Sequence, residues 1–330
     1  MALQRNAGFN GRPMQQKPER RSLTSLEAEN ARNSAEKALW MRQQLRHSMA
    51  GLLANSLPVR PCGGQRVADL RGEGHFHLVP ELFLQTGGST CFTLPHGPLA
   101  LHAGEALLMP PRMLHAEATV GTAFSNIVVY ADGTALTCHL ATETSPGRPG
   151  IDHLESRQHP HAARIHDWLA DAAALGGDAE DADARLQVRA LLASACAGVL
   201  RVLDDAAPRT QPEPPLVARV RMWVNNQLGD HALNVTALAA QAGCTPEYLS
   251  HVFSQTTGGH LIAHINRQRM DRAAHLLAET DMAGKEVAWA CGFTTPSYFI
   301  QTFRQQFGAT PQQWRAKRRM ELGDTAQTLE

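Results

Sequence analysis

The fold of the C-terminal third of this chain is decided by the stretch Val235-Thr-Ala-Leu-Ala-Ala-Gln-Ala-Gly243-Cys-Thr245-Pro246-Glu-Tyr-Leu249-Ser-His-Val-Phe253. The pattern occurs a second time, as Val287-Ala-Trp-Ala-Cys-Gly292-Phe293-Thr-Thr295-Pro296-Ser-Tyr-Phe299-Ile-Gln-Thr-Phe303. Each copy predicts a short apolar helix, a glycine turn, a Thr-Pro helix start and an amphipathic helix, which is the order of a helix-turn-helix. A helical run from Ile265 to Leu277 joins the copies. Two such units in tandem are a far more specific signal than one.

Local chemistry supports this pattern. Gly243 and Gly292 stand where a helix has to end with positive φ, which glycine adopts without steric cost. The next helix is predicted to begin with a threonine cap and a proline in its first turn, at Thr245-Pro246 and at Thr295-Pro296. Apolar residues four apart then predict one buried stripe on each second helix, formed by Leu249 and Phe253 and by Phe299 and Phe303.

Residues from about 215 to 319 resemble the DNA-binding domain of AraC/XylS-type transcription regulators. The first half of the resemblance rests on Ala239, Gly243, Leu249, Phe253, Gly258, Arg269, Ala273 and Leu276-Leu277. The second half rests on Val287-Ala288, Gly292-Phe293, Ser297-Tyr298-Phe299, Phe303, Phe307-Gly308, Thr310-Pro311 and Trp314-Arg315. The resemblance implies seven helices, two DNA-reading units and a rigid linker helix that holds them about one turn of DNA apart.

Bases are expected to be contacted by outward residues in the first turns of each recognition helix. These are Glu247, Ser250, His251, Ser254, Ser297, Ile300, Gln301 and Arg304. Glutamine can pair with adenine, isoleucine can touch a thymine methyl and glutamate can accept from cytosine. Phosphate contacts are expected from Arg304, Arg315, Lys317, Arg318 and Arg319. For each of these positions the alternative is an ordinary solvated surface residue. Arg269, in the linker helix, could form a structural salt bridge instead of contacting DNA.

Composition and charge agree with a two-domain protein that binds DNA. The chain has 330 residues, 43% apolar content and 31 basic against 31 acidic residues. From Pro215 to Met320, however, 11 basic residues face 6 acidic ones, which suits a phosphate backbone. The six cysteines contain no C-x-x-C pair, so a disulfide framework or zinc finger is not expected. No apolar signal core is evident, and we expect a cytoplasmic protein with no membrane partner.

The chain is predicted to be an α+β multidomain protein, with an N-terminal cupin-like β-barrel, flanking helices and an all-α C-terminal domain with two helix-turn-helix units. The predicted segments are a disordered tail (1–24), an N-terminal helix (25–57), the cupin-like sensor domain (60–144), a helical region (160–205), a linker (206–214), the DNA-binding domain (215–320) and a tail (321–330). The helical region either covers the core of the barrel or forms a dimer seam, and its sequence supports both.

The β segment carries a second motif, His75-Phe-His77-Leu-Val-Pro-Glu81, followed by Gly104-Glu-Ala-Leu-Leu-Met-Pro110-Pro-Arg112-Met-Leu-His115. Together these stretches resemble the two cupin motifs, with departures at Arg112 and Thr119, where the motif has glycine and asparagine. In metal-binding cupins, the residues matching His75, His77, Glu81 and His115 hold one divalent ion. Alternate spacing places His75 and His77 on one face, and a His/His/Glu/His set suits Mn, Fe, Ni or Zn.

The same four residues allow two other interpretations. They could line a pocket for a small organic effector without metal, or belong to a purely structural barrel, and Pro80 interrupts the strand before Glu81. The sequence therefore predicts a transcription regulator, not an enzyme, with activation or repression left open. Its expected partners are promoter DNA, an effector, a second copy of the chain and RNA polymerase. The rival function is a metal-dependent cupin enzyme fused to a DNA-binding module, although no second acid–base group accompanies the histidines.

Overall fold

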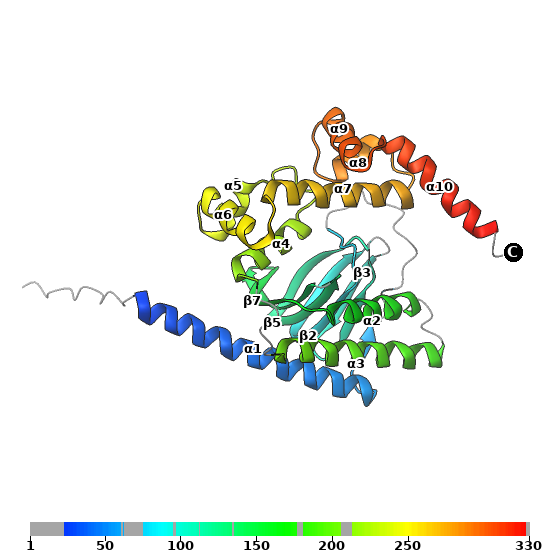
Figure 1. Ribbon diagram of the computed structural model, residues 1–330. Helices are drawn as coiled ribbons and strands as arrows, with labels where there is room; N and C mark the ends of the chain where they lie inside the picture. Colours follow the sequence, from blue (N-terminus) through cyan, green and yellow to red (C-terminus); the bar gives the residue numbers. More distant parts are fainter. Residues whose placement is uncertain are drawn as a thin grey trace, which may run out of the picture.

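The computed structural model of the protein describes residues 23–60, 62, 75–94, 97–111, 113–133, 135–176, 181–205 and 213–327. Most of the expected N-terminal tail (1–24), most of the expected linker and Arg112 lie outside these residues, and the last two positions of the expected tail belong to the first helix. The described part consists of a sheet-rich N-terminal region and a helical C-terminal region (Figure 1).

The N-terminal region is built on one seven-stranded sheet. Its strands are β1 (Val59–Arg60), β2 (Glu81–Leu94), β3 (Gly97–His102), β4 (Ala106–Met109), β5 (Ala116–Asp132), β6 (Ala135–Ser145) and β7 (Arg148–Gln158). The order is β1-β4-β2-β5-β6-β7, with β3 paired to β2, and only the β1–β4 pair is parallel. Among the described residues β1 does not pair with β7, so the sheet is open where the sequence predicted a barrel.

A glycine pair lies inside the long strand β2. Gly87 and Gly88 interrupt β2 only as an irregularity, where the pairing with β5 shifts its register between Gln85 and Ser89. A Cβ at Gly87 would lie 2.6 Å from the backbone oxygen of Ala123, which leaves room for glycine alone. The strand β2 is therefore continuous through the glycine pair but irregular there, as β-bulges allow.

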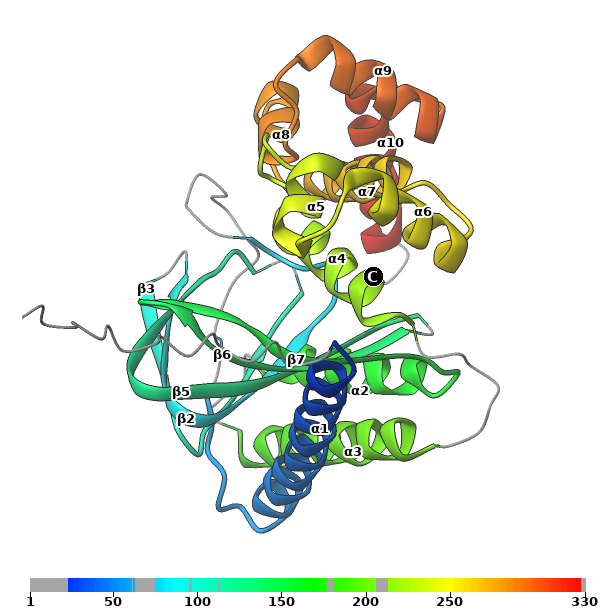
Figure 2. The ribbon, with the colours of Figure 1, turned by 90° about the vertical axis from the view of Figure 1, so that its left-hand side faces the viewer.

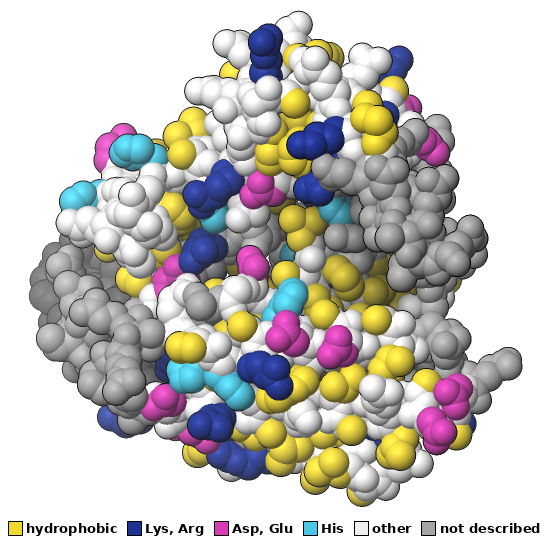
Figure 3. All heavy atoms as spheres, turned by 45° about the vertical axis from the view of Figure 1, so that its right-hand side comes forward, with side chains coloured by type: hydrophobic (Ala, Val, Ile, Leu, Met, Phe, Trp, Pro, Cys, Tyr) yellow, Lys and Arg dark blue, Asp and Glu magenta, His cyan; other side chains and the backbone are white. Residues whose placement is uncertain are grey.

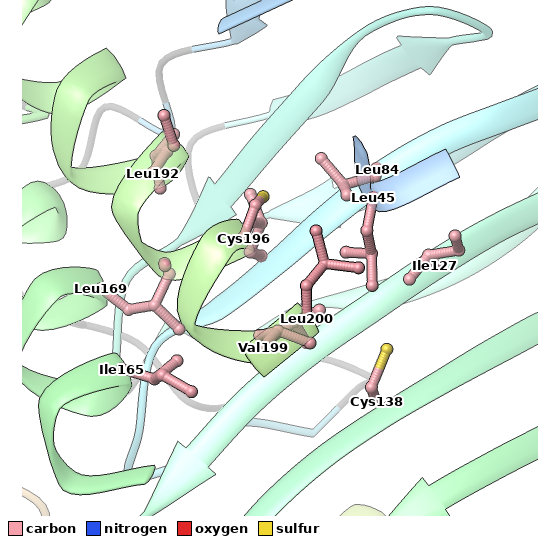
Figure 4. Close-up of a cluster of buried hydrophobic side chains, with 14 of the residues drawn as sticks. Leu45, Leu84, Ile127, Cys138, Ile165, Leu169, Leu192, Cys196, Val199 and Leu200 are labelled. Atoms are coloured by element: carbon pink, nitrogen blue, oxygen red, sulfur yellow. The ribbon is translucent and has the colours of Figure 1, made fainter. Parts of the chain in front are cut away.

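Three helices cover one face of the sheet: α1 (Leu23–Leu53), α2 (Ala162–Leu175) and α3 (Ala182–Asp204) (Figures 1 and 2). Their apolar side chains meet those of the sheet in a single buried cluster (Figure 4). Val188, Leu192 and Val199 of α3 belong to it, so the face that could have been a dimer seam packs inside the chain. By length and composition α3 could cross a membrane, but more than half of its apolar window is buried in this core.

The described part of the C-terminal region contains seven helices, the number that the resemblance implied. They are α4 (Pro215–Asn226), α5 (Val235–Ala242), α6 (Pro246–Thr257), α7 (Leu261–Glu279), α8 (Gly284–Ala290), α9 (Pro296–Phe307) and α10 (Pro311–Gln327). Two apolar clusters divide them, one around α4 to α6 with the start of α7, the other around α7 to α10. The long helix α7 belongs to both clusters and joins the two halves, and α10 continues into the stretch expected to be a tail.

Candidate DNA interface and histidine cavity

The α5–α6 pair has the local structure that the sequence predicted. Gly243 ends α5 in the left-handed region with φ +68°, and Pro246 is in the first turn of α6. Thr245 caps α6, because its hydroxyl accepts a hydrogen bond from the backbone N–H of Tyr248 at 3.2 Å. Asn234 caps α5 in the same way, accepting from the N–H of Ala237 at 2.9 Å. These bonds fix the residue at which each helix begins.

The α8–α9 pair has the same order of elements but a different set of supports. Gly292 has φ +75°, as predicted, and a Cβ there would lie 2.6 Å from the backbone oxygen of Leu228. Thr295 makes no side-chain cap, so the predicted threonine cap is wrong for this pair. At the start of α8, a carboxylate oxygen of Glu286 accepts from the N–H of Ala283 at 2.7 Å. The turn between α8 and α9 is therefore held by close packing around Gly292.

The predicted base-contacting residues lie on the outer sides of α6 and α9. Leu249, Phe253, Phe299 and Phe303 are buried, as the helical stripes predicted. The predicted base-contacting residues face the other way. Two of them are half-buried, Ser250 and Ser254, and the other six are exposed: Glu247, His251, Ser297, Ile300, Gln301 and Arg304. In Figure 3, several Lys and Arg side chains lie over this helical region and above the hollow that separates it from the sheet.

Two arginines of this region are engaged in the fold. Arg315, which we expected at a phosphate, donates from Nε to the Leu277 oxygen at 3.0 Å and from Nη2 to the Met282 oxygen at 2.5 Å. Arg269 donates from Nη2 to the Asp230 oxygen at 2.7 Å, which ties α7 to the loop before α5. Each therefore satisfies backbone carbonyls near a helix end, while Lys317 remains exposed and Arg319 has no described side chain.

The four residues of the cupin-like motif converge on one buried point. His75, His77 and His115 each offer a ring nitrogen, and these nitrogens lie within 4.8 Å of one another. Glu81 Oε1 lies 3.4 Å from His77 Nε2, and Glu81 Oε2 lies 3.7 Å from His115 Nε2. His75 and His115 come from separate segments, which an isolated antiparallel bridge joins with two backbone hydrogen bonds of 2.9 Å. Pro80 ends the first segment just before β2 begins at Glu81.

Burial sets the protonation of this cluster. It lowers the pKa of His115 to about 4, and it lowers the pKa values of His75 and His77 well below the ordinary value. It also raises the pKa of Glu81 well above the ordinary value. Glu81 Oε2 and His115 Nε2 are buried with no hydrogen-bond partner, although buried polar atoms usually have one. His115 Nδ1 is 2.9 Å from the Met113 carbonyl oxygen, which leaves Nε2 to face the cluster.

The comparisons with known proteins concern mainly the helical region. A family model described as a helix-turn-helix domain matches residues 238–317. The uncharacterized HTH-type transcriptional regulator YijO of Escherichia coli (strain K12) is 32% identical over 151 residues, which are 46% of this chain and 52% of that protein. The arabinose operon regulatory protein of Salmonella typhimurium is 24% identical over 219 residues, 64% of this chain and 75% of that protein.

Residues 238–317 are therefore similar to the helix-turn-helix domain of AraC-type transcription regulators. The chain spans about half of the length of YijO, the first of these relatives. A solved structure, the C-terminal domain of AraT, a response regulator from Geobacillus stearothermophilus, is 30% identical and covers 32% of this chain and 87% of its own, with a TM-score of 0.32.

In the sheet-rich region the histidine cluster opens into a cavity of about 760 Å³, which the sequence did not outline. Glu117, Tyr130 and His139 of the sheet line it. Glu117 follows His115 by two residues, and period-two alternation in a strand was the signal that could have found it. Burial raises the pKa of Glu117 to about 7. The opposite wall is helical and comes from Arg219, Met222, Trp223, Asn226 and Gln227 of α4 and from Gln241 of α5.

Proposed function

We propose that this protein reads promoter DNA with two helices, α6 and α9, placed in successive major grooves. The observation that carries the proposal is the pair of outward polar faces on α6 and α9, each backed by a buried apolar stripe and joined through α7. Glu247, His251, Gln301 and Ile300 supply base contacts, and Arg304 and Lys317 supply phosphate contacts. Residues 215–320 act as the DNA-binding domain and 60–144 as the core of the sensor.

The test is a selection of bound sequences from random duplex DNA with the full chain, followed by footprinting on the selected site. Two protected major grooves about ten base pairs apart on one face are expected. Affinity should fall steeply with added salt, because bound Lys and Arg release counterions from the phosphates. Protection of a single groove, or binding that salt does not weaken, contradicts the proposal.

For the sensor we propose a divalent transition-metal ion at His75, His77, His115 and Glu81. The support is the donor set itself: three imidazoles that burial keeps neutral, one carboxylate and two buried atoms without a partner. Neutral imidazole is the form that binds metal, and mixed nitrogen and oxygen ligands suit first-row metals. A bound ion would satisfy Glu81 Oε2 and His115 Nε2 together.

A second candidate ligand is a small organic effector in the same place. The cavity of about 760 Å³ is far larger than one ion needs, and its polar side chains come from both the sheet and α4. Elemental analysis of chelator-free protein separates the candidates. Near-stoichiometric metal that disappears in His77→Ala supports the ion, whereas metal-free protein that is still stabilised by small molecules supports the effector.

The rival function, a cupin enzyme fused to a DNA-binding module, requires turnover at this cluster. The relatives reported above are regulators, and the pocket side chains suffice for binding. We therefore infer a ligand-responsive regulator that also engages a second copy of itself and RNA polymerase. Catalytic turnover of any substrate at the cluster, abolished by His77→Ala, would favour the enzyme.

A further inference from the structure

The segment His75-Phe76-His77 contacts two parts of the molecule at once. His75 and His77 line the histidine cavity, whereas Phe76 is buried in the apolar cluster formed by α7 to α10. Leu114 and His115 divide in the same way, with Leu114 in the helical cluster and His115 at the histidines. Successive side chains of an extended chain point to opposite sides. If a ligand at the histidines moves either segment, it therefore also moves Phe76 or Leu114 relative to α7.

Arg272 of α7 lies over this contact. Its guanidinium carbon is 3.9 Å from the centroid of the Phe76 ring, and the residue is only 5% exposed. Its Nε and Nη1 have no hydrogen-bond partner, and no acidic residue in the described part of the chain pairs with it. A buried cation over an aromatic face gains more than an exposed one. The Phe76 ring is thus the main partner of a charge that has few others.

The charge of Arg272 also reaches the histidines. Burial is the largest cause of the lowered pKa values of His75 and His77, and the positive charge of Arg272 lowers both further. Like charges in a poorly screened interior repel each other strongly. A doubly charged ion at the histidines would therefore act on Arg272 as well as on its own ligands. We call the Phe76, Leu114 and Arg272 packing the α7 contact.

We propose that the histidine site and the α7 contact are coupled and antagonistic, so that a divalent metal ion at His75, His77 and His115 loosens the helical region from the sheet. The inference rests on the proposed metal site. Two effects act in the same direction. The ion fixes the imidazoles around a common point about 2.1 Å from each nitrogen, which repositions the segment that carries Phe76. It also places positive charge beside Arg272.

Coupling of this kind is reciprocal: if metal weakens the α7 contact, the contact weakens metal binding by the same factor. Phe76 and Arg272 are then positioning residues for a site that neither of them touches as a ligand. Removing the contact should raise the affinity of the histidine site for metal. A merely structural role for Phe76 predicts lower stability without tighter metal binding.

The experiment measures the affinity of the full chain for Zn²⁺ by competition with a chromophoric chelator, with His77→Ala defining binding elsewhere. Phe76→Ala should bind Zn²⁺ about fivefold or more tightly than the wild type, the lower end of typical coupling. Leu78→Ala is the matched control, since Leu78 is an apolar residue of the same segment that is 39% exposed and outside the helical cluster. Its affinity should equal that of the wild type.

Small-angle X-ray scattering supplies a second measurement on the same proteins. Zn²⁺ should raise the radius of gyration of the wild type and of Leu78→Ala, whereas Phe76→Ala should be expanded with or without the ion. Phe76→Leu keeps apolar volume but loses the ring, so it should show a smaller rise in affinity. If circular dichroism shows that Phe76→Ala does not fold, the affinity of Phe76→Leu for Zn²⁺ is the measurement that decides.

The outcomes separate the two proposals. A wild type that binds no Zn²⁺ at His77 overturns the metal-sensing proposal and this inference with it. Binding to the wild type with equal or weaker affinity in the Phe76 variants overturns the coupling alone and leaves the metal site in place.

Discussion

The two helix pairs of the C-terminal region share one sequence pattern but are held in place differently. The α5–α6 pair is fixed by its own side chains, since Asn234 and Thr245 each accept a backbone hydrogen bond at a helix start. A Cβ at Gly243 would meet nothing within 4 Å. In the α8–α9 pair, a Cβ at Gly292 would lie 2.6 Å from the backbone oxygen of Leu228 and 2.7 Å from Nη2 of Arg269. Thr295 provides no cap for α9. One pair is locally determined and the other depends on its neighbours.

The neighbours of the second pair include two residues of the sheet-rich region. The apolar cluster that supports α8 and α9 contains Phe76 and Leu114 from the sheet region, whereas the cluster around α5 and α6 contains no residue of that region among those described. A change in the sheet region thus reaches α9 through buried apolar packing, whereas it reaches α5 and α6 through the residues of α4 and α5 that line the histidine cavity. Two helix pairs with similar sequences can therefore differ in how strongly they respond to a change in the sheet region.

The largest expected difference between the pairs concerns their turn glycines. Gly243→Ala places a Cβ in open space at positive φ, so only the strain of about 1–2 kcal/mol applies. Gly292→Ala meets the same strain and also a backbone oxygen 2.6 Å away, which adds about 1–3 kcal/mol of overpacking. We expect the loss in free energy of unfolding, measured by urea denaturation, to be clearly larger for Gly292→Ala. Gly292→Val should abolish folding of the second pair and DNA binding.

Equal losses at the two glycines would contradict the distinction between a locally held pair and a packed pair. A Gly292→Val protein with normal stability and full DNA binding would show that the second turn lies elsewhere.

The reading faces test whether both pairs contact DNA. His251→Ala on α6 and Gln301→Ala on α9 should each relax the base preference at a different position, with the two positions about ten base pairs apart. A loss of about 1–3 kcal/mol is expected for each good base contact. Lys317→Ala is the control, because a phosphate contact should weaken binding to all sequences about equally. The measurement is binding to every single-base variant of the selected site.

If both substitutions leave the preferred sequence unchanged, the assignment of the faces is wrong. If only Gln301→Ala changes it, α9 alone reads bases and the first pair contributes contacts to the backbone.

The sequence predicted what local chemistry decides. Positive φ at Gly243 and Gly292, the prolines in the first turns and the buried phenylalanines of α9 follow from short-range steric and hydrophobic rules. The convergence of the cupin-like histidines also followed, since a motif spaced along two segments already encodes their pairing. The role of Arg315 could not be anticipated, because a basic residue near a helix end gives no indication that distant carbonyls will engage it.

Features decided by distant parts of the chain were missed. The strand β7 carries no clear alternation in its sequence, and its pairing with β6 became evident only in three dimensions. The irregularity at the glycine pair of β2 depends on the partner strand β5, so the sequence of β2 alone could not predict it. The helical wall of the cavity could not be predicted at all, since Trp223 and Asn226 lie about 150 positions away from His75 and His77.

The smallest expected difference concerns the threonine caps. Thr245→Ala removes the acceptor for the Tyr248 N–H, and losing such a cap typically costs about 1 kcal/mol. Thr295→Ala should change the free energy of unfolding by much less, since the Thr295 hydroxyl accepts no bond at the start of α9. Thr→Ser at each position is the control, because serine retains a hydroxyl that can cap. Urea denaturation of the four variants gives the comparison. If Thr295→Ala lowers the free energy of unfolding as much as Thr245→Ala does, the Thr295 hydroxyl caps α9 in solution. The two helix pairs would then be held by the same kind of contact.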